Sequence, residues 1–290
     1  MIIPSDGREV TGLPVRRLTA GDLPACSALA VDRGWEPAPE KWRLLLELGE
    51  IYGADDPDGG LAGAVALTRY GPELAAIGKM LVAQRRGRQG LGGRLMRHAM
   101  DQVGDTVTCL LATEYGRPLY ERLGFRAIDR SIRYIGPFAA EPQGGSSGAG
   151  SPPRPVGQAD LPGIGELDQR SFGADRGPLL AALPRLADRF MVSDGPAGPG
   201  FGAAWRSADT LTIGPLVAQD LTVATALITS LAAGSDQPVR LEVPGRHPGL
   251  AGWAAARGLT VRSQSTLMVH GGDLPGAREH VYGPANMALC

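Results

Sequence analysis

Residues 81–96 of this 290-residue chain read Leu81-Val82-Ala83-Gln84-Arg85-Arg86-Gly87-Arg88-Gln89-Gly90-Leu91-Gly92-Gly93-Arg94-Leu95-Met96. The apolar segment 77–82 predicts a β-strand, and the apolar spacing from Leu95 to Val103 predicts an amphipathic helix. Glycines between them let backbone N–H groups approach a ligand, and a helix N-terminus favours negative charge. The stretch therefore predicts an anion site suited to a phosphate or pyrophosphate.

The type of phosphate site can be narrowed from the same residues. The loop lacks the Gly-Lys-Ser/Thr ending of a P-loop, so nucleotide triphosphate hydrolysis is not supported. A dinucleotide-binding reading also fits poorly, because no acidic residue ends a second strand at the expected distance. Positive charge is expected around the loop from its four arginines, Arg85, Arg86, Arg88 and Arg94.

A second motif follows downstream and reads Gly116-Arg117-Pro118-Leu119-Tyr120-Glu121-Arg122-Leu123-Gly124-Phe125. Its pattern predicts a short amphipathic helix that carries Tyr120 and ends at Gly124 in the manner of a C-cap. Phe125 then begins the next strand.

Together the two motifs resemble the GNAT superfamily of acyl-CoA-dependent N-acyltransferases. The first family motif reads V-x-P-x-x-R/Q-x-x-G-x-G/A, and Val82, Gly90 and Gly92 stand at matching positions. Gln84 replaces the proline and Gly87 replaces the Arg/Gln. Because the loop binds mainly through backbone amides, coenzyme binding is expected to survive these departures. The second family motif, a Tyr followed four residues later by Gly-Phe, is matched from Tyr120 to Phe125.

The resemblance implies an α+β (three-layer α/β) fold with a mixed, mainly antiparallel sheet flanked by helices. It also implies acetyl-CoA as co-substrate and no metal. The backbone at Leu81 and Val82 would pair with pantetheine and polarise the thioester. The full set of expected coenzyme-binding residues is Leu81, Val82, Gly87, Arg88, Gln89, Gly90, Leu91, Gly92, Gly93, Thr113 and Gly116.

In the family mechanism the acceptor amine attacks the thioester directly. Tyr120 is the expected general acid, because a phenol with a pKa near ~10 is protonated at neutral pH and can donate to a thiolate. Glu114, just after a predicted strand, is the first choice for general base. Glu73, Glu36 and Glu50 are alternatives, and a water chain could serve instead.

The acceptor pocket is expected to involve Trp35 and Glu36, which lie in the region that shapes this pocket in relatives. Trp35 stands between Gly34 and Pro37, which suits either a substrate contact or a packed loop anchor. Trp42 is expected to pack in the core with Leu45 and Leu46.

The chain is long enough for two domains. Residues 143–153 form a Gly/Ser/Pro-rich linker by composition, which predicts a domain at 1–138, a linker at 139–154 and a second domain at 155–290. Leu216-Val217-Ala218-Gln219 echoes residues 81–84, and residues 253–259 echo residues 119–125. We therefore expect two tandem GNAT-like domains.

The second half differs from the first at both motifs. By this alignment its loop is shorter, has no glycine and carries Asp220 where a phosphate would lie, and Ala254 stands opposite Tyr120. The second domain is therefore expected not to bind acyl-CoA, but to support the first domain, shape the acceptor pocket or carry a dimer contact.

Composition limits the remaining possibilities. The net charge of −1 gives no general case for nucleic-acid or membrane partners, and no apolar run reaches the length of a membrane-spanning helix. The four histidines and three cysteines show no metal-ligand spacing, and Cys109 is expected to be a buried small hydrophobe. A cytoplasmic protein of bacterial type is expected.

The sequence thus predicts an acetyl-CoA-dependent N-acetyltransferase that modifies a primary amine of a small molecule, with the N-terminal domain catalytic. Two alternatives stay open: a non-catalytic acyl-CoA-binding sensor or scaffold, and a protein or peptide N-acetyltransferase. A longer acyl donor and a homodimer also stay open.

Overall fold

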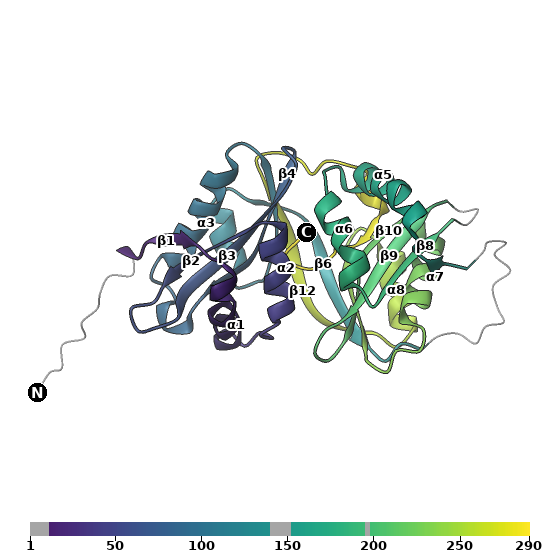
Figure 1. The fold of residues 1–290 in the computed structure, drawn as a ribbon, viewed down its shortest axis with the longest axis horizontal. Coiled ribbons are helices and arrows are strands. Elements are labelled where there is room, and N and C mark those ends of the chain that lie inside the picture. The colour runs from purple at the N-terminus through teal and green to yellow at the C-terminus, as the bar shows by residue number, and fades with distance from the viewer. Residues whose placement is uncertain (1–11, 140–151, 195–197) are drawn as a thin grey trace, which may run out of the picture. The chain divides into compact units, whose positions relative to one another are not determined.

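The computed structural model describes residues 12–139, 152–194 and 198–290 (Figure 1). It shows one series of elements twice. The first series is β1 (Val15–Arg17), α1 (Leu23–Asp32), α2 (Pro39–Leu48), β2 (Glu50–Asp55), β3 (Leu61–Tyr70), β4 (Leu74–Val82), α3 (Leu91–Val103), β5 (Val107–Ala112), α4 (Arg117–Arg122) and β6 (Arg126–Gly136). The second series is β7 (Arg154–Pro155), α5 (Leu161–Phe172), α6 (Gly177–Leu186), β8 (Arg189–Ser193), β9 (Gly200–Arg206), β10 (Leu211–Ala218), α7 (Leu221–Ala232), β11 (Val239–Pro244), α8 (Pro248–Ala256) and β12 (Thr260–His270). Strand β13 (Val281–Gly283) follows the second series.

The predicted fold class is confirmed: mainly antiparallel sheet pairing with flanking helices. The repeat suspected from two short echoes extends over the whole order of elements. Most of the expected linker lies outside the described residues, and the domain boundaries stay a prediction.

The described chain separates into two compact units, one of residues 12–68 and 77–104 and one of residues 69–76 with the described part of 105–290. In the first unit, β1 pairs with β2 and β2 with β3, both antiparallel. Helix α3 packs closely on β3: a Cβ added at Gly63 would lie 2.8 Å from Cδ1 of Leu95 and 2.9 Å from the carbonyl oxygen of Leu81. Glycine at this position therefore permits the approach of the helix that follows the loop.

The second unit contains a strand exchange between the two series. Its strand order is β5-β12-β6-β11-β10-β9-β8-β7. Strand β12 of the second series pairs antiparallel with β5 and β6 of the first, and β6 also pairs with β11. In Figure 1 the teal β6 and the yellow β12 lie side by side. The final strand of each series is therefore hydrogen-bonded between strands of the other.

Strand β10 changes partner along its length. Residues Leu211 to Ile213 pair in parallel with β11, whereas Leu216 and Val217 pair antiparallel with β13. The ring of His247 and the guanidinium of Arg246 both bond the carbonyl oxygen of Val281, at 3.0 and 3.1 Å. Strand β13 is thus anchored against the later part of β10.

The expectations for individual core residues are confirmed. Trp42 and Cys109 are both fully buried. In the second unit, α7 lies against β9, where a Cβ at Gly200 would meet Val223 at 2.6 Å. In the part of the chain that the structure describes, none of the helices combines the length and apolar character needed to cross a membrane.

Candidate functional site

The glycine-rich loop runs from the end of β4 to the start of α3. A short 3-10 turn, Gln84–Arg86, opens it, and Gly90 closes it as the helix N-cap with φ of +81°. No side chain caps α3, and a Cβ at Gly90 would find no heavy atom within 4 Å. The N–H groups of the first helical turn have no partner inside the helix, so they face open space and can receive an anion.

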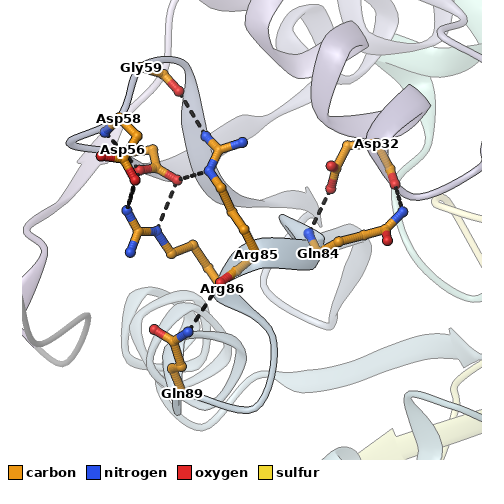
Figure 2. Close-up of polar contacts among 8 residues, drawn as sticks. All are labelled: Asp32, Asp56, Asp58, Gly59, Gln84, Arg85, Arg86 and Gln89. Carbon is orange, nitrogen blue, oxygen red and sulfur yellow. Dashed lines mark hydrogen bonds and ion pairs between the residues drawn. The ribbon is translucent and has the colours of Figure 1, made fainter. Parts of the chain in front are cut away.

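Asp56 anchors the loop through two of its arginines (Figure 2). Its carboxylate accepts two bonds from Arg86, at 2.7 and 3.1 Å, and one from Arg85 at 2.8 Å. Arg86 also reaches Asp58 at 2.7 Å, and Arg85 donates to the carbonyl oxygen of Gly59 at 2.9 Å. The Asp56 side chain is fully buried. These bonds join the loop to the turn between β2 and β3.

These contacts of Asp56 with Arg85 and Arg86, here called the Asp56 anchor, change the expected charge of the loop. Hydrogen bonds from Arg86 hold the pKa of Asp56 down at about 2, so its carboxylate is ionised at neutral pH. Asp56 and Asp58 therefore offset the charges of Arg85 and Arg86. This corrects the expectation that all four arginines add positive charge: two serve the anchor. Arg94 donates to the carbonyl oxygen of Leu13 at 2.5 Å.

Two other predicted loop residues also have defined conformations. Gln89 donates to the carbonyl oxygen of Arg85 at 3.1 Å, which ties the loop to itself. Arg88 is exposed and has φ of +60°, a left-handed conformation that non-glycine residues seldom adopt.

Gln84 shows why this chain can depart from the family's proline. Its backbone N–H, which a proline would lack, donates to the carboxylate of Asp32 at 2.7 Å, and its side-chain amide donates to the Asp32 carbonyl oxygen. Two hydrogen bonds to the end of α1 thus fix the start of the loop.

Trp35 and Trp42 share a cation. The ammonium of Lys79 lies 5.5 Å from the ring centroid of Trp35 and 5.0 Å from that of Trp42. Lys79 lies within β4 and has a left-handed φ of +49°. Trp35 is 42% exposed, and neighbouring Glu36 pairs with Lys41 at 3.5 Å. The predicted acceptor residues therefore lie on the α1–α2 connection, with Trp35 beside β4.

In the second unit the structure brings together three predicted residues. A Cβ added at Gly116 would lie 3.1 Å from Cε2 of Tyr120 and 3.4 Å from both the Tyr120 hydroxyl and the Thr113 hydroxyl. The Tyr120 ring packs edge-on against the ring of Phe125, with the two centroids 6.1 Å apart. Burial raises the pKa of the Tyr120 hydroxyl to about 12. Within the described residues this hydroxyl has no hydrogen-bond partner. The phenol therefore stays protonated at neutral pH and has its proton available to donate.

Three of the four candidate bases, Glu36, Glu50 and Glu114, differ in their surroundings. Glu36 pairs with Lys41, and Glu50 pairs with Arg17 at 3.3 Å. Glu114 is exposed, and among the described residues its carboxylate has no ion pair or hydrogen bond. Glu114 lies in the second unit, next to Thr113, whereas the loop lies in the first.

The second series differs from the first at the N-terminus of the helix after the loop and at the position of Tyr120. Its loop between β10 and α7 is only residues 219–220, and the Asp220 carboxylate caps α7 by accepting from the N–H of Val223 at 2.9 Å. The N–H of Phe125 bonds the Tyr120 carbonyl oxygen at 3.0 Å, and Leu259 bonds that of Ala254 at 3.2 Å. Matching bonds therefore place Ala254 at the position equivalent to Tyr120.

Sequence reasoning missed three elements of this arrangement. Asp32 and Asp56 form hydrogen bonds with the loop although they lie about 50 and 30 residues before it in the chain. The sequence around Asp56, Asp56-Pro57-Asp58-Gly59-Gly60, predicts a turn but not its contact with the loop. Lys79 was read as an ordinary strand residue. No group of three or more His, Cys, Asp or Glu residues in the described chain is placed to hold a metal ion.

Comparisons with known proteins agree with this architecture. Two family models, each described as an acetyltransferase (GNAT) domain, match residues 47–127 and 164–283, together more than half of the chain. The N-acetyltransferase YitH of Bacillus subtilis (strain 168) is 26% identical over 260 residues, covering 88% of this chain and 91% of that protein.

Solved structures show the same fold. A putative acetyltransferase from Pyrococcus horikoshii superposes with a TM-score of 0.82 at 21% identity, covering 99% of both chains. A tandem GNAT protein from the clavulanic acid biosynthesis pathway has a TM-score of 0.62 at 15% identity, covering 90% of this chain and 99% of that one.

Replacing Asp56 by Asn should lower the free energy of unfolding by about 2 kcal/mol at pH 7, because Arg85 and Arg86 lose a buried charged partner. The folded-state pKa of Asp56 is depressed, so its carboxylate stabilises the fold above the unfolded pKa near ~4 and this stability is lost as the pH falls through about 2. The difference in the free energy of unfolding between wild type and variant, measured by urea unfolding, should therefore become smaller from pH 4 towards pH 2.

The matched control is Asp58→Asn, because the Asp58 side chain is 71% exposed and contacts only Arg86 in this cluster. It should cost less than about 1 kcal/mol. Equal losses for the two variants, or a gap that does not change with pH, would show that Asp56 is not the anchor.

Proposed function

Because this chain belongs to the GNAT acetyltransferases and carries two of their domains in tandem, we propose that its N-terminal half transfers an acetyl group from acetyl-CoA to a primary amine of a small molecule. The chain is an acyltransferase. One observation carries the choice of half: α3 begins at Gly90 with no side-chain cap, whereas α7 is capped by Asp220. Of these two corresponding helices, only α3 begins with N–H groups that no side chain caps, and such groups can receive a pyrophosphate.

The coenzyme would be bound mainly by backbone groups. Residues of the loop and first turn of α3, Gly87, Arg88, Gln89, Gly90, Leu91, Gly92 and Gly93, would hold the pyrophosphate. Leu81 and Val82 would pair with pantetheine, and Thr113 with Gly116 would flank the chain that leads to the thioester. The open space around Gly90 and the uncapped helix fit this role.

Acetyl-CoA would supply the reactive thioester. As the acceptor nitrogen bonds the carbonyl carbon, the carbon–sulfur bond breaks, and Tyr120 would give its proton to the departing thiolate. A phenol with a pKa of about 12 keeps this proton across the neutral range, so the proton is present when the thiolate departs. Glu114, whose carboxylate has no partner among the described residues, would take the proton from the amine.

The C-terminal half is proposed not to bind the coenzyme. Leu216 and Val217 correspond to Leu81 and Val82, but their strand is already paired with β13. Pantetheine would have to displace that strand, and pyrophosphate would have to approach the carboxylate of Asp220. Trp35 and Glu36 are proposed to contact the acceptor.

Gly90→Asp should weaken acetyl-CoA binding at least about 100-fold, because a carboxylate would enter the space meant for pyrophosphate. Gly90→Asn is the matched control: Asn has the same shape, lacks the charge and tolerates a positive φ better than most residues. It should remain within about tenfold of wild type. Calorimetric titration measures both, and equal affinity of the two variants would exclude Gly90 from the pyrophosphate site.

The same titration should give one acetyl-CoA per chain. Leu216 and Val217 are occupied by β13, and the N-terminus of α7 is occupied by Asp220. Two sites per chain would overturn the assignment of the C-terminal half, and no binding would overturn the proposed function.

Tyr120→Phe should lower kcat by about 10²–10⁴-fold and leave the acetyl-CoA affinity within about twofold, because only the donated proton is lost. With a pKa of about 12, ionisation of Tyr120 should leave the wild-type kcat unaffected below about pH 10. Steady-state kinetics across pH measures both effects. A wild-type kcat in the variant would remove Tyr120 from the mechanism.

A further inference from the structure

A polar cavity of about 390 Å³ opens in the second unit. Residues of both series line it: Glu114, Arg117, Pro118 and Glu121 from α4 and the segment before it, and Gln264 and Thr266 from β12. Its volume lies in the range of small-molecule sites, roughly 300–1,000 Å³. The exchanged strand is what brings the two series together here.

Strand pairing brings β12 close to the segment that carries Glu114. Thr266 pairs with Ala112, the last residue of β5, and Glu114 follows two residues later, in the turn before α4. Gln264 and Thr266 stand two residues apart on β12 and share one face of that strand. The exchanged strand thus supplies two of the polar side chains that line the cavity.

The charges of the cavity are only partly satisfied. Arg117 and Glu121 form an ion pair one helical turn apart, at 2.7 Å. Within the described residues, no hydrogen bond or ion pair engages the side chains of Glu114, Gln264 or Thr266. The cavity thus presents one uncompensated carboxylate, a neutral amide and a hydroxyl, next to a neutralised pair.

We propose that this cavity binds a small organic cation that carries hydroxyl groups, such as an amino alcohol or an amino sugar. The ammonium would bind Glu114, and the hydroxyls would exchange hydrogen bonds with Gln264, Thr266 and the Arg117–Glu121 pair. An anion would meet a net negative charge, and an apolar molecule would leave these groups unpaired. Only two carboxylates are present, too few for a metal site of protein ligands.

The proposed site adjoins Tyr120 without containing it. Arg117 and Glu121 lie one turn apart on α4 and Glu114 lies in the turn before it, while Tyr120 lies close to Gly116 and Thr113. A bound cation would therefore contact the helix that carries the proposed general acid. The ligand could be the acceptor itself or a separate molecule that adjusts turnover, since both have the same recognition chemistry.

The test uses a matched pair of probes on the whole protein without coenzyme: 1-amino-1-deoxysorbitol and sorbitol, which differ by one amine. Saturation-transfer and titration NMR should show the amine binding at least about tenfold more tightly than the alcohol. Gln264→Arg, which adds a cation to the cavity that Glu114 lines, should weaken amine binding at least about tenfold, and Gln264→Glu should strengthen it about three- to tenfold.

Gln169 is the matched control, because it is an exposed residue of α5 that does not line the cavity. Gln169→Arg should bind the amine as wild type does. No binding of the amine, equal binding of sorbitol, or equal effects of Gln264→Arg and Gln169→Arg would overturn the proposal. Acetyl-CoA binding is measured in a separate titration. A protein that binds acetyl-CoA but not the amine would contradict only the cation site, whereas a protein that does not bind acetyl-CoA would contradict the proposed function.

Kinetics then identify the source of the cation. If the acceptor occupies the cavity, Gln264→Arg should raise its KM at least about tenfold with acetyl-CoA affinity unchanged. If a separate molecule occupies it, the amine probe should inhibit wild type, because its ammonium would engage Glu114, the proposed base. It should not inhibit Gln264→Arg, and this substitution by itself should leave the KM of the acceptor the same. Either result supports a cation site.

Discussion

Backbone polar groups at a strand end and at a helix N-terminus must find partners, and the two halves of this chain satisfy that requirement differently. In the first series a glycine-rich loop leaves the N-terminus of α3 without a side-chain cap. In the second, Asp220 caps α7 and β13 pairs with the end of β10. Two copies of one fold thus diverge where backbone groups are either open to a ligand or satisfied by the chain itself, which is why only the first is proposed to bind a coenzyme.

The exchange of β6 and β12 makes the second series necessary to the first. Strand β5 ends just before Glu114 and pairs with β12, a strand about 150 residues later in the chain. Without β12 one edge of β5 would lose its antiparallel partner, and unpaired strand edges are costly or prone to aggregate. Whether or not it binds a coenzyme, the second series therefore has a structural role: β12 completes the pairing of β5 and β6 and supplies Gln264 and Thr266 to the cavity.

The sequence was informative where structure depends on nearby residues. The order of strands and helices in the first half, the fully buried Trp42 and the helix end at Gly124 all follow from local apolar spacing or from a positive φ. The sequence did not predict contacts between residues that lie far apart in the chain. Hydrophobic periodicity identifies β12 as a strand but does not say which strands it joins, and β13 is too short to be recognised. Asp56 looked like a turn residue, because nothing local shows that it binds two arginines about 30 residues away.

The Asp56 anchor also bears on specificity. Had Arg85 and Arg86 pointed freely into the loop, any multivalent anion would have been attracted by charge alone, and binding would weaken steeply with salt. With both guanidiniums held by Asp56 and Asp58, the loop is anchored and the charges of these two arginines are offset, which leaves Arg88 as the exposed cation of the loop. Recognition then depends less on the total charge and more on N–H groups that must match the oxygens of a ligand, a geometric requirement. A loop with three arginines can thus favour an anion of the right shape, because two of them stabilise the protein and leave most of the recognition to the backbone.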